Sequence, residues 1–189
     1  MTAADEQPIA IVDNWLNIAH KLPSPNFNQR PENIPVSLLV IHNISLPPGE
    51  FGGGYVQQFF QNRLDASAHP YFASIANLQV SAHLFIDRAG KVTQFVAFDQ
   101  RAWHAGTSSF EGVANCNDYS IGIELEGTDT LPYTDEQYAV LVKVTRQLLV
   151  TYPTLTPARI TGHEHIAPGR KTDPGPAFSW SRYSASLGT

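Results

Sequence analysis

Two histidines and an aspartate lie at positions from which they could bind a metal ion together. His42 directly follows a compact apolar run, His163 follows a short segment rich in branched residues, and Asp173 precedes a proline in a Gly- and Pro-rich stretch. Two imidazoles and one carboxylate form a recognised catalytic zinc set that leaves the fourth position for water. Metal-assisted hydrolysis is therefore one chemistry open to this chain.

Residue types and spacing do not by themselves select these three residues. The chain holds 7 histidines and 17 acidic residues, and it has no His-Glu-x-x-His helix. A lone histidine at a strand end is more often a hydrogen-bonded packing residue, and an aspartate before a proline is commonly a turn residue. We interpret His69, which precedes a proline, and His83, within an expected strand, as structural.

Two carboxylates offer a second chemistry. Residues 120–126 predict a strand whose period of two places Glu124 and Glu126 on one face and Ile121, Ile123 and Leu125 on the other. The two glutamates would lie ~6.6 Å apart along the strand, near the lower limit for the carboxylate pair of an inverting glycosidase. That alternative leaves the histidines and Asp173 without a role. A glutamate on the open face of a half-buried strand is more often only a polar surface residue.

The candidate ligands follow predicted strands. Residues 36–41 form an almost wholly apolar run, typical of a strand that is covered on both faces and central in a mixed or parallel sheet. His42 follows at its C-terminal end, where ligands usually bind in open α/β sheets. Residues 159–161 are expected to be a short strand that delivers His163 into a loop running to Pro176.

A hairpin and a long helix account for much of the remaining chain. Residues 80–87 and 92–98 predict a β-hairpin in which Gly90 supplies the turn conformation. The clearest helix begins at Thr134, because Thr-Asp-Glu-Gln is a capping box and apolar residues then recur at helical spacing until Pro153. We expect this helix to pack on the sheet.

Two shorter helices are expected in the first third of the chain. One covers residues 15–20 and resembles a flap over the molecule. The other follows a Gly-rich loop at residues 47–54 and places Val56, Phe59 and Phe60 on one side.

The composition limits the class of protein. With 189 residues, 42% of them hydrophobic, the chain fits a single domain over residues 1–189, of which we expect residues 1–8 to be flexible. A net charge of −5 argues against sequence-independent nucleic-acid binding. No run approaches the ~18 apolar residues of a membrane helix, and the start lacks the pattern of a signal peptide, so we expect a cytoplasmic protein. Cys116 stands alone, which excludes an intrachain disulfide and a multi-cysteine zinc finger; we expect it to be buried.

Several long motifs occur in a fixed order, in residues 37–52, 102–106, 117–130, 161–163 and 170–175. Together they resemble the type 2 N-acetylmuramoyl-L-alanine amidases, in particular those that act on 1,6-anhydro-muropeptides in bacterial cell-wall recycling. The resemblance extends from about Trp15 to Arg182, and motifs in register are far more specific than one short pattern. It implies an α/β fold, with a mixed central β-sheet flanked by helices, like that of the peptidoglycan recognition proteins.

The resemblance also implies the site. The family's Zn²⁺ ligands fall on His42, His163 and Asp173, its catalytic carboxylate falls on Glu124, and a second catalytic group falls on Lys171. Without the resemblance, Lys171 would be interpreted as a solvated loop charge. The implied substrate is an anhydro-muropeptide, in which the lactyl group of (1,6-anhydro-)N-acetylmuramic acid is amide-linked to the L-alanine of a stem peptide.

Some positions near the motifs keep more than one interpretation. Trp103 and His104 are either packing residues or part of a sugar pocket, and Arg101 and Arg170 would suit an acidic substrate. The sequence departs from the family's pattern at Gly169 and at Glu164-His165, which makes His165 a second candidate ligand or a buffering group, although only His163 occupies the matching motif position. A binding-only peptidoglycan recogniser is the rival function, and it is disfavoured because all three ligand positions are filled.

Overall fold

The computed structural model describes residues 8–188. The segment expected to be flexible, residues 1–8, therefore lies outside the described residues except for Pro8. The strands are β1 (Ile11–Val12), β2 (Trp15–Leu16), β3 (His20–Lys21), β4 (Phe27–Gln29), β5 (Leu38–Ile44), β6 (Leu84–Ile86), β7 (Val92–Gln94), β8 (Gln100–Ala102), β9 (Ser109–Phe110), β10 (Val113–Ala114), β11 (Ser120–Glu126) and β12 (Ile160–Gly162). The α-helices are α1 (Tyr55–Phe60), α2 (Asp135–Thr151), α3 (His163–Ile166) and α4 (Trp180–Leu187), and the 3₁₀ helices are η1 (Pro70–Ser74), η2 (Cys116–Asp118) and η3 (Pro157–Arg159).

A mixed sheet forms the centre of the molecule, as the sequence predicts. Within residues 8–188 it has six strands in the order β12-β5-β11-β6-β7-β3. Strands β12, β5, β11 and β6 run parallel, and β7 is antiparallel to β6. The apolar strand β5 is central, but it is longer than expected, because its pairing with β11 continues as far as Ile44. His42 therefore lies within the strand and does not follow it.

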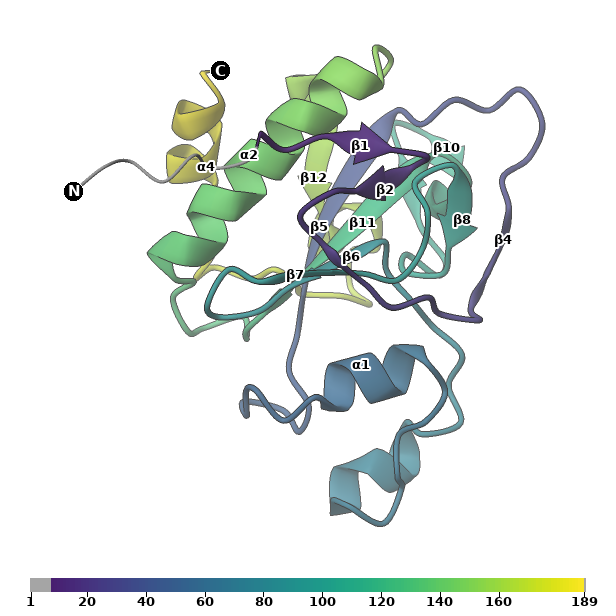
Figure 1. The fold of residues 1–189 in the computed structure, drawn as a ribbon, viewed down its shortest axis with the longest axis vertical. Coiled ribbons are helices and arrows are strands. Elements are labelled where there is room, and N and C mark those ends of the chain that lie inside the picture. The colour runs from purple at the N-terminus through teal and green to yellow at the C-terminus, as the bar shows by residue number, and fades with distance from the viewer. Residues whose placement is uncertain (1–7, 189) are drawn as a thin grey trace.

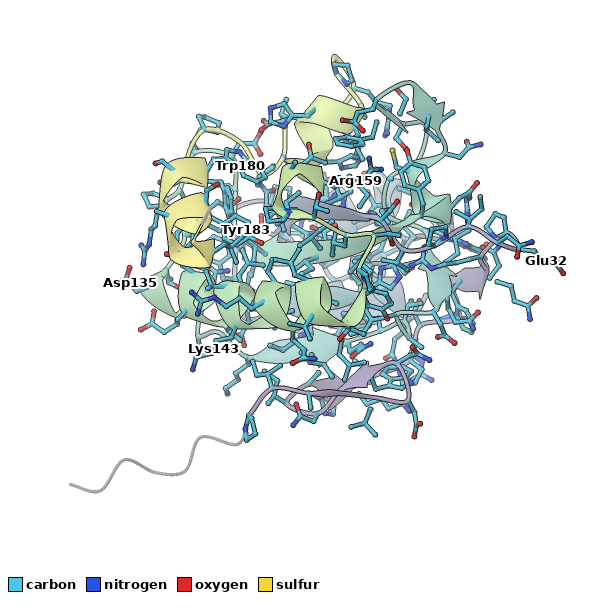
Figure 2. The ribbon with its side chains drawn as sticks, turned by 90° about the horizontal axis from the view of Figure 1, so that it is seen from above. Glu32, Asp135, Lys143, Arg159, Trp180 and Tyr183 are labelled. Carbon is cyan, nitrogen blue, oxygen red and sulfur yellow. The ribbon has the colours of Figure 1, made fainter. Side chains whose placement is uncertain are left out.

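One face of the sheet packs against the long helix. The residues of this face belong to the same buried cluster as the apolar side of α2; the sheet residues are Leu39, Ile41, Ile121, Ile123 and Leu125, and the helix residues are Tyr138, Leu141, Val144 and Leu148. The predicted capping box is confirmed, since the Thr134 hydroxyl accepts from Gln137 N and the Gln137 side chain accepts from Thr134 N, both at 3.1 Å. Helix α4, which the sequence does not predict, lies beside α2 (Figure 2). The Tyr183 hydroxyl of α4 and the Thr145 hydroxyl of α2 are 2.6 Å apart.

The opposite face of the sheet carries the polar candidates. On β5, His42 shares this face with Leu38 and Val40, which pack against Ala105 and Cys116. Every residue of β11 is buried, so the alternative interpretation of Glu124 as a polar residue on the open face of a half-buried strand is wrong. The loop containing residues 104–117 covers this face, and the prediction that Cys116 is buried is confirmed.

The lower part of the molecule in Figure 1 is built around α1. This helix buries Val56, Phe59 and Phe60, as its spacing predicts, against a separate apolar cluster that includes Phe85 and Phe95. The predicted hairpin is also confirmed, with Gly90 at a φ of 78° between β6 and β7.

The helix expected at residues 15–20 is wrong. This segment forms short strands, and β2 pairs with β1 in a hairpin in which Val12 faces Trp15. The two residues between them, Asp13 and Asn14, have φ values of 49° and 66°. Positive φ at both central positions is the geometry of the tight turns that suit the twist of a hairpin. In the described part of the chain, no helix is both long and apolar enough to cross a membrane.

Candidate active site

Three side chains from distant parts of the chain meet on the polar face of the sheet. His42 comes from β5, His163 begins α3, and Asp173 lies in the loop that follows. The Nδ1 atoms of the two histidines are 3.0 Å apart, and each lies 3.1 Å from Asp173 Oδ2. Tetrahedral zinc with ligands at ~2.0–2.1 Å places the donor atoms ~3.3–3.4 Å from one another. The three atoms therefore have nearly the spacing that one zinc ion requires.

The hydrogen bonds of His163 show why this triangle suits a cation. Its Nε2 lies 3.2 Å from the Ala105 carbonyl oxygen, which can only accept, so Nε2 carries a proton. In the neutral ring, Nδ1 then presents a bare lone pair to a carboxylate oxygen, and two acceptors repel each other unless a cation lies between them. Two neutral imidazoles and a carboxylate are also the ligand set of catalytic zinc sites.

Electrostatics favours the forms that bind metal. Burial lowers the pKa of His42 to about 4, so its imidazole is neutral at neutral pH. Burial alone would raise the pKa of Asp173, but where Nδ1 of either ring carries a proton, its hydrogen bond to the carboxylate outweighs burial and lowers that pKa well below the usual range. The neutral ring and the ionised carboxyl are the protonation states in which these groups coordinate a metal.

The loop that carries Asp173 is fixed on both sides. Asn43 Nδ2 donates to the Pro174 carbonyl at 3.2 Å, and the Tyr133 hydroxyl donates to the same oxygen at 2.8 Å. Gly175 follows at a φ of 77° and packs so closely on Asp129 that a Cβ atom would overlap the Asp129 backbone. These contacts explain why a loop residue can be placed as accurately as one on a strand.

Glu124 lies beside the triangle. On β11, Glu124 is paired in register with His42 of the adjacent parallel strand β5, and only 9% of Glu124 is exposed. Its Oε2 atom has no hydrogen-bond partner among the described residues. Burial raises the pKa of Glu124 well above its usual value, Asp173 raises it further, and Lys171 opposes them. A buried, unpaired carboxyl of raised pKa is suited to exchanging a proton with a bound molecule.

Glu126 is committed to the backbone. Its two carboxylate oxygens accept from Gly52 N at 2.7 Å and Arg88 N at 3.0 Å, which ties the Gly-rich loop and the β6–β7 turn to β11. The glycosidase alternative needs both glutamates free to exchange protons or attack a sugar. The geometry therefore disfavours that alternative.

A cavity of about 850 Å³ opens over these groups. Glu124, His163, Asp173 and Lys171 line it together with Trp103 and His104. The Gly-rich loop contributes through Pro48 and Gly49, and the segment around η1 contributes apolar side chains such as Tyr71 and Leu78. Four of the five sequence-derived candidates, all except the deeply buried His42, therefore share one cavity with mixed polar and apolar walls.

Other polar candidates lie elsewhere or are engaged in structural contacts. The His165 side chain is 59% exposed and lies 3.7 Å from a Glu164 carboxylate oxygen, outside the ligand triangle. Arg101 pairs with Asp118 at 2.6 Å and does not line the cavity. Arg170 does line it, but donates to the carbonyls of Ala105 and Thr107.

The remaining histidines of the sequence analysis make structural contacts. His69 caps η1 by accepting from Tyr71 N at 3.1 Å, and His83 Nδ1 accepts from Gly122 N at 3.0 Å. These partners are backbone amides, in agreement with the structural interpretation.

Comparison with known proteins identifies the family. The family model described as N-acetylmuramoyl-L-alanine amidase matches residues 32–176. The chain belongs to this amidase family. Among its relatives, 1,6-anhydro-N-acetylmuramyl-L-alanine amidase AmpD of Citrobacter freundii is 57% identical over 173 residues, which are 92% of each chain. A crystal structure of a selenomethionine AmpD derivative is 55% identical and superimposes with a TM-score of 0.91, covering 94% of this amidase and 98% of that chain.

A more distant neighbour carries a ligand. The N-acetylmuramyl-L-alanine amidase AmiD of Escherichia coli, in complex with the substrate anhydro-N-acetylmuramic acid-L-Ala-D-γ-Glu-L-Lys, matches with 25% identity and a TM-score of 0.60, covering 96% of this amidase and 66% of that chain. The expected fold class, a mixed sheet flanked by helices as in type 2 amidases, is confirmed by these neighbours.

Sequence reasoning missed the groups behind the ligands. The sequence leaves His104 as either a packing residue or part of a sugar pocket, yet its Nδ1 lies 2.9 Å from His42 Nε2. Asn117, which was only part of a motif, binds the backbone of the segment that contains His104. No sequence spacing predicts the contact between His104 and His42, because it joins a loop to a strand 62 positions away.

Proposed function

We propose that this amidase hydrolyses the amide bond between the lactyl group of 1,6-anhydro-N-acetylmuramic acid and the L-alanine of the stem peptide, as a zinc enzyme of peptidoglycan recycling. The observation that carries the proposal is the triangle of His42, His163 and Asp173 beside the buried carboxyl of Glu124, with His163, Asp173 and Glu124 lining one cavity. The anhydro-muropeptide substrate is supported by the names of AmpD relatives that are 57% identical over most of their length.

In this proposal His42, His163 and Asp173 hold Zn²⁺. At such a site the ion acts as a Lewis acid, which makes water more acidic and polarises an amide carbonyl. Glu124 takes the proton from the attacking water and returns it to the departing alanine nitrogen, the usual double role of a general base that becomes an acid. The raised pKa of Glu124 suits this role, because a base of higher pKa accepts a proton more readily.

Lys171 supplies positive charge on the wall of the same cavity. Attack on the amide carbon leaves negative charge on the former carbonyl oxygen, and an ammonium group near that oxygen stabilises the charge where it develops. Pairing with a developing charge lowers the barrier more than pairing with the neutral substrate. We therefore expect Lys171→Gln to reduce kcat more than it raises KM.

The test is digestion of anhydro-muropeptide with and without a chelator, followed by zinc restoration. We expect the chelator to abolish activity and zinc to restore it, with mass spectrometry detecting the intact stem peptide and the anhydro-sugar as separate products. Glu124→Gln should retain stoichiometric zinc and lose about 10²–10⁴-fold in turnover, the range for a general acid–base group. Asp173→Asn should lose zinc, because a neutral amide oxygen replaces the charged ligand.

The rival binding-only function makes different predictions. A protein that binds muropeptide, lacks stoichiometric zinc and stays inert after zinc addition would refute the amidase proposal. Equal zinc loss in Glu124→Gln and Asp173→Asn would refute the assigned roles but not the reaction.

A further inference from the structure

The two histidine ligands are oriented from behind by the same short segment. Nδ1 of His42 and of His163 points into the ligand triangle, so each ring presents Nε2 to the protein. His42 Nε2 meets His104 Nδ1 at 2.9 Å, and His163 Nε2 donates to the carbonyl of the next residue, Ala105, at 3.2 Å. Metal-binding histidines depend on such outer hydrogen bonds for ring orientation and tautomer.

Metal binding by His42 fixes which atom donates in each of the two hydrogen bonds that His104 makes. If His42 Nδ1 binds a metal, its proton lies on Nε2, which must donate to His104 Nδ1. His104 then carries its own proton on Nε2, which donates to the Ser120 hydroxyl at 3.0 Å. Both nitrogens of His104 are thereby used, so the ring has no nitrogen left to recognise a sugar, although its edge lines the cavity.

The segment itself is held by buried partners. Asn117 Oδ1 accepts from both His104 N at 3.1 Å and Ala105 N at 2.8 Å, and the Asn117 residue is buried. Arg170 donates to Ala105 O at 2.6 Å, the oxygen that His163 also uses. The contacts to both ligand rings therefore come from two adjacent residues of one fixed segment, the His104 side chain and the Ala105 carbonyl.

The neighbouring strand prevents His104 from moving. A Cβ atom on Gly122 of β11 would lie 2.5 Å from His104 Cγ and Nδ1 and 2.8 Å from Cδ2. The imidazole thus occupies the space that a glycine leaves open in a strand buried on both faces. His104 is 8% exposed, so few alternative rotamers are open to it.

We propose that His104 is a positioning residue for the metal centre: through its Nδ1 acceptor it fixes the tautomer and orientation of His42, and Asn117 holds it in place to do so. This inference rests on the proposed zinc function, since it concerns affinity for that ion. Removal of such an outer partner typically costs 10- to 100-fold in metal affinity or activity.

Two substitutions of His104 distinguish the effect of losing the Nδ1 acceptor from the effect of losing the volume of the ring. In His104→Asn, Oδ1 takes the place of Nδ1 and can accept from His42 Nε2, but ring volume is lost. In His104→Leu, apolar volume is kept and the acceptor is removed. Zinc affinity is measured by competition with a chromophoric chelator, and the ligand geometry is followed by the visible absorption of Co²⁺ bound in place of Zn²⁺. Unfolding in urea without metal reports the stability of each variant.

We expect His104→Leu to bind zinc about 10- to 100-fold more weakly, with an altered Co²⁺ spectrum, and His104→Asn to recover most of the affinity and the wild-type spectrum. Wild-type affinity in His104→Leu, or equal loss in both variants, would overturn the positioning role while leaving the proposed function intact. A wild-type protein that binds no zinc would overturn both.

Discussion

Gly122→Ala tests how tightly the fold encloses His104. The added Cβ atom would lie 2.5 Å from two atoms of the imidazole, about 1 Å inside ordinary van der Waals contact, and both the strand and the imidazole are buried. Overpacking of this kind costs about 1–3 kcal/mol. Relief by a shift of the ring would lengthen the 2.9 Å contact with His42, so we also expect zinc to bind more weakly.

The effect of Gly122→Ala on the unfolding free energy should change sign when the same substitution is made in His104→Ala. Gly122 has no positive φ, so an alanine there is unstrained and should stabilise the protein by about 0.4–1 kcal/mol once the ring is gone. We therefore expect Gly122→Ala to destabilise the wild type and to be neutral or stabilising in His104→Ala. The assay is urea unfolding of the four proteins in chelator, with equal m-values required. An equal cost in both backgrounds would refute the claim that the ring occupies the glycine's space.

Three further changes test separate parts of the molecule. Burial lowers the pKa of His83 from 6.5 to about 3, so between these pH values the unfolded chain binds a proton at His83 and the folded protein does not. The contribution of neutral His83 to the unfolding free energy is therefore fully present above pH 6.5 and is lost as the pH falls toward 3. At pH 5 the unfolding free energy lost in this way reaches ~2 kcal/mol. Between pH 7 and pH 5, the unfolding free energy of the wild type should therefore fall by ~2 kcal/mol more than that of His83→Gln. Thr134→Ala should lower the unfolding free energy by ~1 kcal/mol because the capping box of α2 is lost, whereas Thr134→Ser should preserve it; thermal denaturation at fixed pH distinguishes the two. His165→Ala should keep wild-type zinc stoichiometry, measured by atomic absorption, because its exposed side chain lies outside the ligand triangle; zinc loss would reinstate it as a ligand.

The elements predicted correctly from the sequence are those with local causes. The bounds of β11 follow from its alternation, and the start of α2 follows from a capping box that is complete within four residues. The helix predicted for residues 15–20 is wrong because the structure of this segment depends on a turn that its own sequence does not reveal. Trp15 and Leu16 belong to a hairpin only because Asp13 and Asn14 adopt positive φ, and that turn has no glycine to signal it.

The site, too, contains some features that the local sequence predicts and others that depend on distant residues. The sequence predicts His42 at the end of one buried strand and Glu124 within a second strand, but the choice of these two over other histidines and acids depends on family motifs. Glu126 illustrates the limit, since period two gives it the same face as Glu124, yet its carboxylate is engaged by two backbone amides from distant loops. The role of His104 was equally hidden, because it depends on a glycine of another strand.

The pairing of His42 with Glu124 on adjacent central strands has an evolutionary consequence. Both residues lie on central strands of the sheet, whereas much of the cavity wall comes from loops, including Pro48, Gly49 and residues 128–130. Loop sequences can diverge with little effect on the strands beneath them. A lineage could thus acquire new muropeptide preferences by exchanging surface segments while inheriting its hydrolytic apparatus unaltered.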